Sequence, residues 1–189
     1  QDAQAIGGWN GPGPYKIVNN YLEGSGENVM FGGADPRVPD LVPSDIEIRG
    51  NHFFKPLAWR KADPTFAGQA WTVKNLLELK NARRVWIEGN VLEYSWVHGQ
   101  VGFAVLWTPR GEGGKAPWCA VEDVTFVNNV VRHCSSGFAI AAEDDHPQSD
   151  TSKRLLIRNN LVEDINPTRF GGDGRLFQLT SPRRPIAEL

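Results

Sequence analysis

The residues best suited to chemistry lie in the apolar segment Leu77-Glu78-Leu79-Lys80 and shortly after it. Glu78 and Lys80 are two residues apart, so on a strand both would point to one face. Cleaving a uronic-acid polysaccharide by β-elimination needs a cation for the carboxylate, a base for the C5 proton and an acid for the leaving oxygen. Calcium held by Glu78, with Lys80 as the base and Arg110 as the acid, would supply these three functions. The alternative is an exposed ion pair on a strand surface.

A second cluster, Glu143-Asp144-Asp145-His146, follows an apolar segment. Three successive carboxylates could bind Ca²⁺ through hard oxygen ligands, with Glu143 as a candidate metal ligand. Asp144 and Asp145 could instead be the acid and base of a glycosidase, which uses two carboxyl groups. A solvated acidic loop would have the same composition.

Other candidates stand apart from these two clusters. His98 is a further candidate acid or base, and Arg175 could bind substrate from the glycine-rich segment 171–175, which could equally be a simple turn. The chain has seven tryptophans, and four lie in or beside predicted loops: Trp59, Trp71, Trp107 and Trp118. If those loops share one face, the four side chains would wall a carbohydrate-binding cleft. Otherwise they fill the core.

An internal repeat predicts the elements that would position these residues. Five segments share the pattern apolar-x-apolar-x-[Asn/Gly]-Asn-x-apolar: residues 15–24, 46–55, 85–94, 124–133 and 155–164. The common asparagine occurs at 20, 51, 90, 129 and 160. The alternation before it is typical of a short strand.

The residue before the common asparagine is always Asn or Gly, the two types that best tolerate positive φ. Each repeat is therefore expected to bend sharply there and to enter a second strand. Stacked repeats would align the asparagines in a hydrogen-bonded ladder with a structural role. Apolar segments at 28–31, 76–79, 103–107, 138–141 and 176–179 supply a further strand for each repeat. The pattern predicts an all-β parallel solenoid of about five coils, with loop insertions.

These repeats, from residue 15 to about 180, resemble the pectate-lyase-like right-handed parallel β-helix family. The chain also looks like the uncharacterised secreted β-helix proteins of soil bacteria. Glu78, Lys80 and Arg110 are similar to an arrangement in the chondroitinase-B-like and alginate-lyase families, although fewer acidic metal ligands are present here. The resemblance implies a protein that cleaves glycosidic bonds of an extracellular polysaccharide, by elimination or hydrolysis. The alternatives are a non-catalytic carbohydrate-binding or surface module, or an inactive fragment stabilised by oligomerisation.

Composition sets the remaining expectations. The 189 residues suit one domain, residues 1–189, and a net charge of −2 argues against a nucleic-acid partner. Without a long apolar run, we expect no membrane span. Gln1 suggests a processed start after export, hence a secreted or periplasmic location. Cys119 and Cys134 are expected to be buried thiols rather than a disulfide. The tail 181–189 does not continue the repeat, which favours a truncated solenoid or pairing with another copy.

Overall fold

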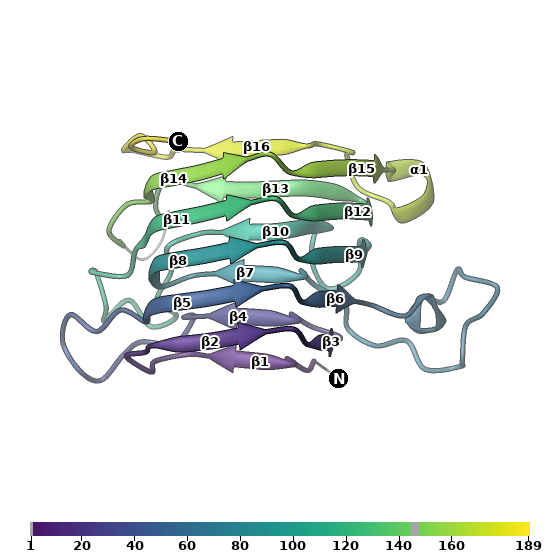
Figure 1. Ribbon diagram of the computed structural model, residues 1–189, viewed down its shortest axis with the longest axis horizontal. Helices are drawn as coiled ribbons and strands as arrows, with labels where there is room; N and C mark the ends of the chain where they lie inside the picture. Colours follow the sequence, from purple (N-terminus) through teal and green to yellow (C-terminus); the bar gives the residue numbers. More distant parts are fainter. Residues whose placement is uncertain (1, 145–147) are drawn as a thin grey trace.

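The computed structural model describes residues 2–144 and 148–189 and contains three parallel sheets wound into a right-handed β-helix (Figure 1). Sheet A contains β1 (Ile6–Gly8), β4 (Val29–Phe31), β7 (Leu77–Leu79), β10 (Phe103–Trp107), β13 (Ser136–Ala141) and β16 (Phe177–Thr180). Sheet B contains β2 (Tyr15–Val18), β5 (Ser44–Arg49), β8 (Ala82–Glu88), β11 (Val121–Val127) and β14 (Lys153–Arg158). Sheet C contains β3 (Tyr21–Glu23), β6 (His52–Phe54), β9 (Val91–Ser95), β12 (Val130–Cys134) and β15 (Leu161–Ile165).

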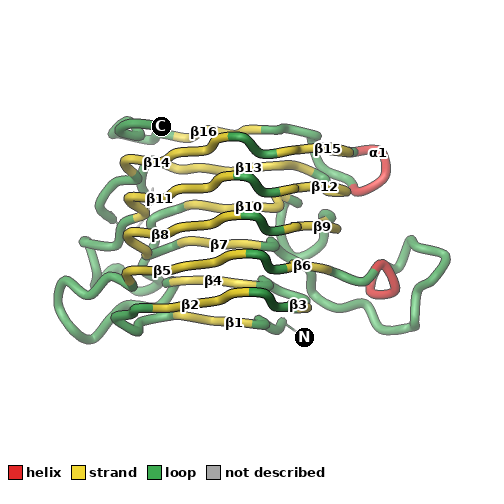
Figure 2. The backbone as a smooth tube through the Cα atoms, viewed as in Figure 1, coloured by secondary structure: helices red, strands yellow, loops and turns green. Residues whose placement is uncertain are grey.

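The chain passes through one strand of each sheet per coil, in the order A, B, C, and then enters the next coil (Figure 2). Each predicted asparagine segment is a sheet B strand and a sheet C strand that meet at a corner, as the repeat indicated. The second set of apolar segments forms sheet A. The sequence did not reveal β1, which pairs with β4 and adds a sixth strand to that sheet.

The predicted asparagine ladder is present at the corner between sheets B and C. The side-chain Nδ2 of Asn51 donates to Oδ1 of Asn90 at 3.0 Å, and Nδ2 of Asn90 donates to Oδ1 of Asn129 at 2.9 Å. Asn20 and Asn160 continue the ladder at its two ends. Each amide oxygen also accepts the backbone N–H of the preceding rung, as Oδ1 of Asn90 does from Asn51. The ladder thus fixes each coil in register with the next.

The residue before each ladder asparagine adopts the left-handed conformation, as expected, with φ between 56° and 64° at Asn19, Gly50, Gly89, Asn128 and Asn159. A second column of left-handed residues lies near the start of the sheet B strands: Asp45, Arg84, Asp123 and Arg154. The repeat did not predict this column, because arginine is not a residue type associated with positive φ. Ion pairs join its members in twos, Asp45 with Arg84 and Asp123 with Arg154.

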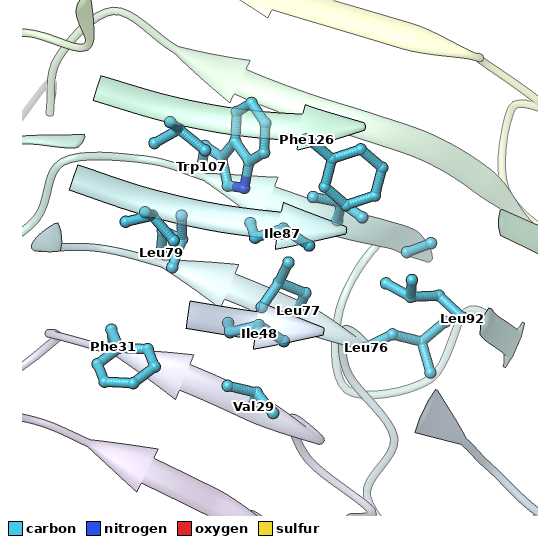
Figure 3. Packing of buried hydrophobic residues seen from close by; sticks show 14 of the residues in the cluster. Val29, Phe31, Ile48, Leu76, Leu77, Leu79, Ile87, Leu92, Trp107 and Phe126 are labelled. Carbon is cyan, nitrogen blue, oxygen red and sulfur yellow. The ribbon is translucent and has the colours of Figure 1, made fainter. Parts of the chain in front are cut away.

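The core lies inside the coil and is formed by inward side chains from all three sheets (Figure 3). Leu77 and Leu79 of β7 are fully buried, and Phe31 and Trp107 lie in the same layer of stacked strands. Cys119 and Cys134 are buried free thiols, as the sequence favoured. No helix among the described residues is long and apolar enough to cross a membrane.

Insertions leave the coil between strands, as the surplus length of the repeats predicted. One, between β6 and β7, carries the short helix η1 (Leu57–Trp59), and another between β15 and β16 carries α1 (Pro167–Phe170). The tail folds back over the last coil. The backbone N–H of Leu155 donates to the carbonyl of Glu188 at 2.8 Å, and Lys153 forms a parallel bridge with Ala187. The tail therefore pairs with β14, which the sequence did not anticipate.

Replacing a central rung should destabilise the fold more than replacing a terminal one. Asn90 is 1% exposed, and its side chain makes four hydrogen bonds, to Asn51, Asn129 and the carbonyl of Ile48. Because Asn90→Ala leaves buried polar groups without partners, it should lower the free energy of unfolding by about 2–5 kcal/mol. Asn20→Ala, at the exposed end, should cost under about 1 kcal/mol. Equal losses in urea titrations would contradict the cooperative ladder.

Substitutions of Gly89 test the left-handed corner conformation alone, because a side chain added there contacts no neighbouring residue. Its φ is +64°, and a Cβ added there would meet nothing within 4 Å. Gly89→Val should therefore cost about 1–2 kcal/mol from backbone strain alone, whereas Gly89→Asn should cost less than half as much. Thermal unfolding of the two variants measures the difference, and a Val variant as stable as the Asn variant would contradict the assignment.

Candidate functional site

The outer face of sheet A carries a polar groove. Met30, Glu78 and Leu106 are neighbours in the register of β4, β7 and β10 and point away from the core. Two adjoining cavities, of about 550 and 660 Å³, lie over these strands, and both are lined by Lys80 and Arg110. We call the two cavities together the sheet A cleft.

Glu78 and Lys80 share the outer face of sheet A, as the strand periodicity predicted. The Nζ atom of Lys80 lies 3.2 Å from Oε1 of Glu78. The pair is not exposed, however: Glu78 is fully buried and 21% of the Lys80 side chain reaches solvent. Nδ2 of Asn75 donates to the other carboxylate oxygen of Glu78 at 3.0 Å. Lys80 is therefore the member of the pair that a ligand in the cleft could touch.

A second buried carboxyl group, Glu27, contacts Glu78. It lies just before β4, is 1% exposed and lies close enough to Glu78 for each carboxyl group to shift the pKa of the other. Nε2 of Gln4 donates to Glu27 at 3.1 Å, and Nζ of Lys74 lies 3.4 Å from its other oxygen. Two carboxyl groups buried close together disfavour the ionisation of both, so that the pKa of one of them rises.

The surroundings favour a proton on Glu78. The pKa of Glu78 rises from its usual 4.5 to about 7: burial is the main cause, the charge of Lys80 acts against it, and nearby Glu27 adds to it. Burial also acts to raise the pKa of Glu27. Hydrogen bonds from Gln4 and Glu78 and the charges of the two lysines outweigh it, so that the pKa of Glu27 falls below its usual value. Glu78 can thus exchange a proton near neutral pH, beside an amine that faces the cleft.

Lys55, at the end of β6, secures the turn that leads to Glu27. It is fully buried, and its Nζ donates to the carbonyls of Gly24, Ser25 and Gly26 at 2.5, 3.2 and 2.8 Å. Burial lowers the pKa of Lys55 to about 7. The three carbonyl contacts position the turn, and through it Glu27, below the cleft.

Arg110 and the acidic cluster lie at the other end of the cleft. Arg110 makes a bidentate ion pair with Asp144, with both N–O distances at 2.8 Å. Glu143, also buried, pairs with Arg183 at 3.2 Å and Arg184 at 2.5 Å. Glu143 and Asp144 are therefore not part of a solvated acidic loop, because arginines of the tail pair with Glu143 and Arg110 pairs with Asp144. Asp145 and His146 lie outside the described residues.

The predicted calcium site is not supported by this arrangement. Within residues 2–144 and 148–189, no group of three or more His, Cys, Asp or Glu side chains could hold a metal ion. Lysine or arginine already contacts the carboxylates of Glu78 and Glu143. The described carboxylates of Glu78 and Glu143, already paired with cations, therefore do not fit a calcium ion.

The predicted tryptophan wall does not form. Trp107 is fully buried in the core, so it cannot stack on a sugar. Trp59 and Trp71 pair with each other at 6.2 Å on the long insertion, and the indole of Trp118 donates to the carbonyl of Leu41 at 3.2 Å. Trp9, 51% exposed, lines the cleft instead. It precedes the first repeat, so the repeat pattern gave no reason to select it.

His98 and Arg175 also lie apart from the residues that line the cleft. Nδ1 of His98 accepts the backbone N–H of Val73 at 3.2 Å. Arg175 pairs with Asp173 at 3.0 Å and lines a smaller cavity of about 300 Å³ beside Val97. The sequence thus identified Glu78, Lys80, Arg110 and Glu143 as candidates, and all four line the cleft. It missed Glu27, Lys74 and Trp9.

The raised pKa of Glu78 predicts how stability depends on pH. Between about pH 4.5 and 7, the folded chain keeps a proton on Glu78 that the unfolded chain releases. The Glu78 contribution to the free energy of unfolding must therefore fall as the pH rises through this window. Glu78→Gln should flatten that fall, measured by urea unfolding at several pH values. Glu112→Gln, at an exposed position lining the same cleft, is the control and should follow the unmodified chain; a Glu78→Gln curve parallel to it would contradict the assignment.

No protein-family model matches the chain, and neither the curated proteins nor the solved structures contain a significant match to it. The assignment as a parallel β-helix rests on the strand order and register described above.

Proposed function

We propose that this chain is a secreted or periplasmic protein that cleaves glycosidic bonds of a polysaccharide bound in the sheet A cleft. The observation that carries the proposal is the contact between Lys80 and the buried carboxyl of Glu78, with the amine facing the cleft. An amine beside a carboxyl group that titrates near neutral pH is suited to moving a proton at physiological pH.

The cleavage that fits this pair best is β-elimination of a uronic-acid sugar. When Glu78 is ionised, at or above about pH 7, Lys80 passes its proton to that carboxylate and the neutral amine then removes the C5 proton of the sugar. The electrons of the C5–H bond form the C4–C5 double bond, and the C4–O bond breaks. Water in the open cleft protonates the leaving oxygen, and Glu78 gives its proton to the hydroxide that remains. Lys80 is the catalytic residue in this scheme, and Glu78 with Glu27 positions it and stores its proton.

Arg110 has a different role from the one that the sequence suggested. A guanidinium group does not give up its proton in proteins, so Arg110 is unsuited to protonate a leaving group. Its planar group is suited to binding a carboxylate, as it binds Asp144. We therefore propose that Arg110 binds and orients the uronate carboxylate beside its ion pair with Asp144.

Elimination is favoured over hydrolysis by the spacing of the carboxyl groups. The two carboxyl groups of a glycosidase lie about 5–9.5 Å apart, to leave room for the sugar or a water molecule. Glu27 and Glu78 are both buried, and Glu143 and Asp144 are held in ion pairs with arginines, so these carboxyl groups are not placed to flank a glycosidic bond.

A non-catalytic carbohydrate-binding role is the second candidate. The observation in its favour is that Lys74, Lys80 and Arg110, the lysines and arginine lining the first cavity, each already contact a carboxylate. Such a surface could bind a polysaccharide through hydroxyl groups and Trp9 without cleaving it.

Lys80→Met, which keeps the length of the side chain but removes the amine, tests the proposal. Incubated with polygalacturonate, alginate and hyaluronan, the unmodified chain should release ends that absorb in the ultraviolet, the sign of a new C4–C5 double bond. The variant should be slower by at least about 100-fold, since it lacks the proton acceptor. Lys16→Met is the matched control, because Lys16 is 69% exposed on sheet B, and it should leave the rate unchanged.

The same assay separates the alternatives. New reducing ends without ultraviolet absorbance would contradict elimination and indicate hydrolysis. Retarded migration in polysaccharide gels without any cleavage would contradict the enzyme and favour the binding module. Full activity of Lys80→Met would contradict the assigned role of Lys80.

A further inference from the structure

The outer face of sheet B carries an exposed tryptophan at its centre. Trp86 belongs to β8, which pairs with β5 on one side and β11 on the other, and half of its surface is exposed. Its outward neighbours in the register are Glu47 and Thr125. Sheet B lies in front of sheet A in Figure 1, so this surface is separate from the sheet A cleft.

The Trp86 ring is held in place by its surroundings. Its Nε1 donates to Oε2 of Glu88, two residues along the same strand, at 3.1 Å. The backbone on both sides is paired in a continuous ladder of parallel strands. A rigid aromatic ring contributes contact area at a small entropic cost on binding, which is the property of a stacking platform.

A cavity of about 360 Å³ adjoins Trp86, within the range of small-molecule sites. Charged side chains from β5 and β8 form most of its remaining lining: Asp45, Glu47, Arg49, Arg84 and Glu88. Arg84 is in a bidentate ion pair with Asp45, at 2.7 and 2.8 Å, and Arg49 contacts Glu47. The cavity thus combines an aromatic wall with many hydrogen-bonding groups whose charges largely balance.

This chemistry selects the class of ligand. A strongly acidic or basic ligand would have to compete with ion pairs that already exist. A neutral sugar would not, because its hydroxyl groups can donate to the outer carboxylate oxygens and accept from the guanidinium groups. Its apolar C–H face can lie on the indole. Because neighbouring strands are about 4.8 Å apart, a polymer crossing the coils would continue over equivalent positions of sheet B.

We propose that Trp86 and the adjoining cavity bind a neutral polysaccharide, on a face distinct from the sheet A cleft. This site goes beyond the proposed function and does not depend on it. Binding here would hold the chain on a neutral polymer while the cleft remains accessible.

Affinity gel electrophoresis tests this site, with mixed-linkage β-glucan, xylan or galactomannan as neutral probes and polygalacturonate as an acidic one. At least one neutral polymer should retard the unmodified chain. Trp86→Ala should weaken that retardation by about tenfold, and Trp86→Phe should restore most of it, because phenylalanine keeps an aromatic face. Leu161→Ala, at an exposed apolar position on sheet C and therefore outside this row, is the matched control and should bind like the unmodified chain. Circular dichroism confirms that each variant is folded.

Several outcomes would overturn the proposal. It fails if no neutral polymer retards the unmodified chain, if only polygalacturonate does, or if Trp86→Ala binds as well as Leu161→Ala. It also fails if sedimentation shows a dimer that Trp86→Ala dissociates, since a second copy would then cover this face. Loss of cleavage in Lys80→Met with unchanged retardation would leave this site intact, which separates its fate from that of the cleft.

Discussion

The asparagine ladder is the interaction on which the rest of the structure depends. A parallel strand pair has no intrinsic preference for one register over a shift by two residues, because such a shift keeps inward side chains inward. The ladder removes this freedom, since each amide bonds both the side chain and the backbone of the adjacent coil. The left-handed residue before each asparagine makes the bend that brings the amide into the interior.

The fixed register also determines which side chains meet on sheet A, on the opposite side of the coil. With the coils aligned, β4 and β7 pair so that Met30 lies beside Glu78, and the buried carboxyl group of Glu27 comes close enough to Glu78 to influence its pKa. The buried lysine Lys55, on the sheet C side, ties the turn before Glu27 to the same framework. The ladder itself takes no part in chemistry. It determines which polar side chains of successive coils meet in the cleft.

The sequence predicted the features that repeat locally and missed those that depend on contacts between coils. The ladder and its corners follow from adjacent residues in every repeat, and the Glu78–Lys80 face follows from strand periodicity. Glu27 and Trp9 lie outside the repeated pattern, so only the three-dimensional stacking brings them to the cleft. The position of the tail could not be predicted from a repeat, because ion pairs of Arg183 and Arg184 with Glu143, about 40 residues earlier in the chain, hold it in place. Trp107 was proposed as a substrate-binding residue, yet its side chain is buried in the core. In a strand that is apolar throughout, the sequence does not show which side chains face inward.

The aligned coils bury Glu27 and Glu78 beneath Lys80, and burial keeps Glu78 protonated well above the usual range of a carboxyl group. Carbon-13 NMR of labelled glutamate side chains, followed through a pH titration, measures this directly. One glutamate, absent from the spectrum of Glu78→Gln, should titrate near pH 7. A spectrum in which every glutamate carboxyl titrates below about pH 5, as solvated carboxyl groups do, would contradict it.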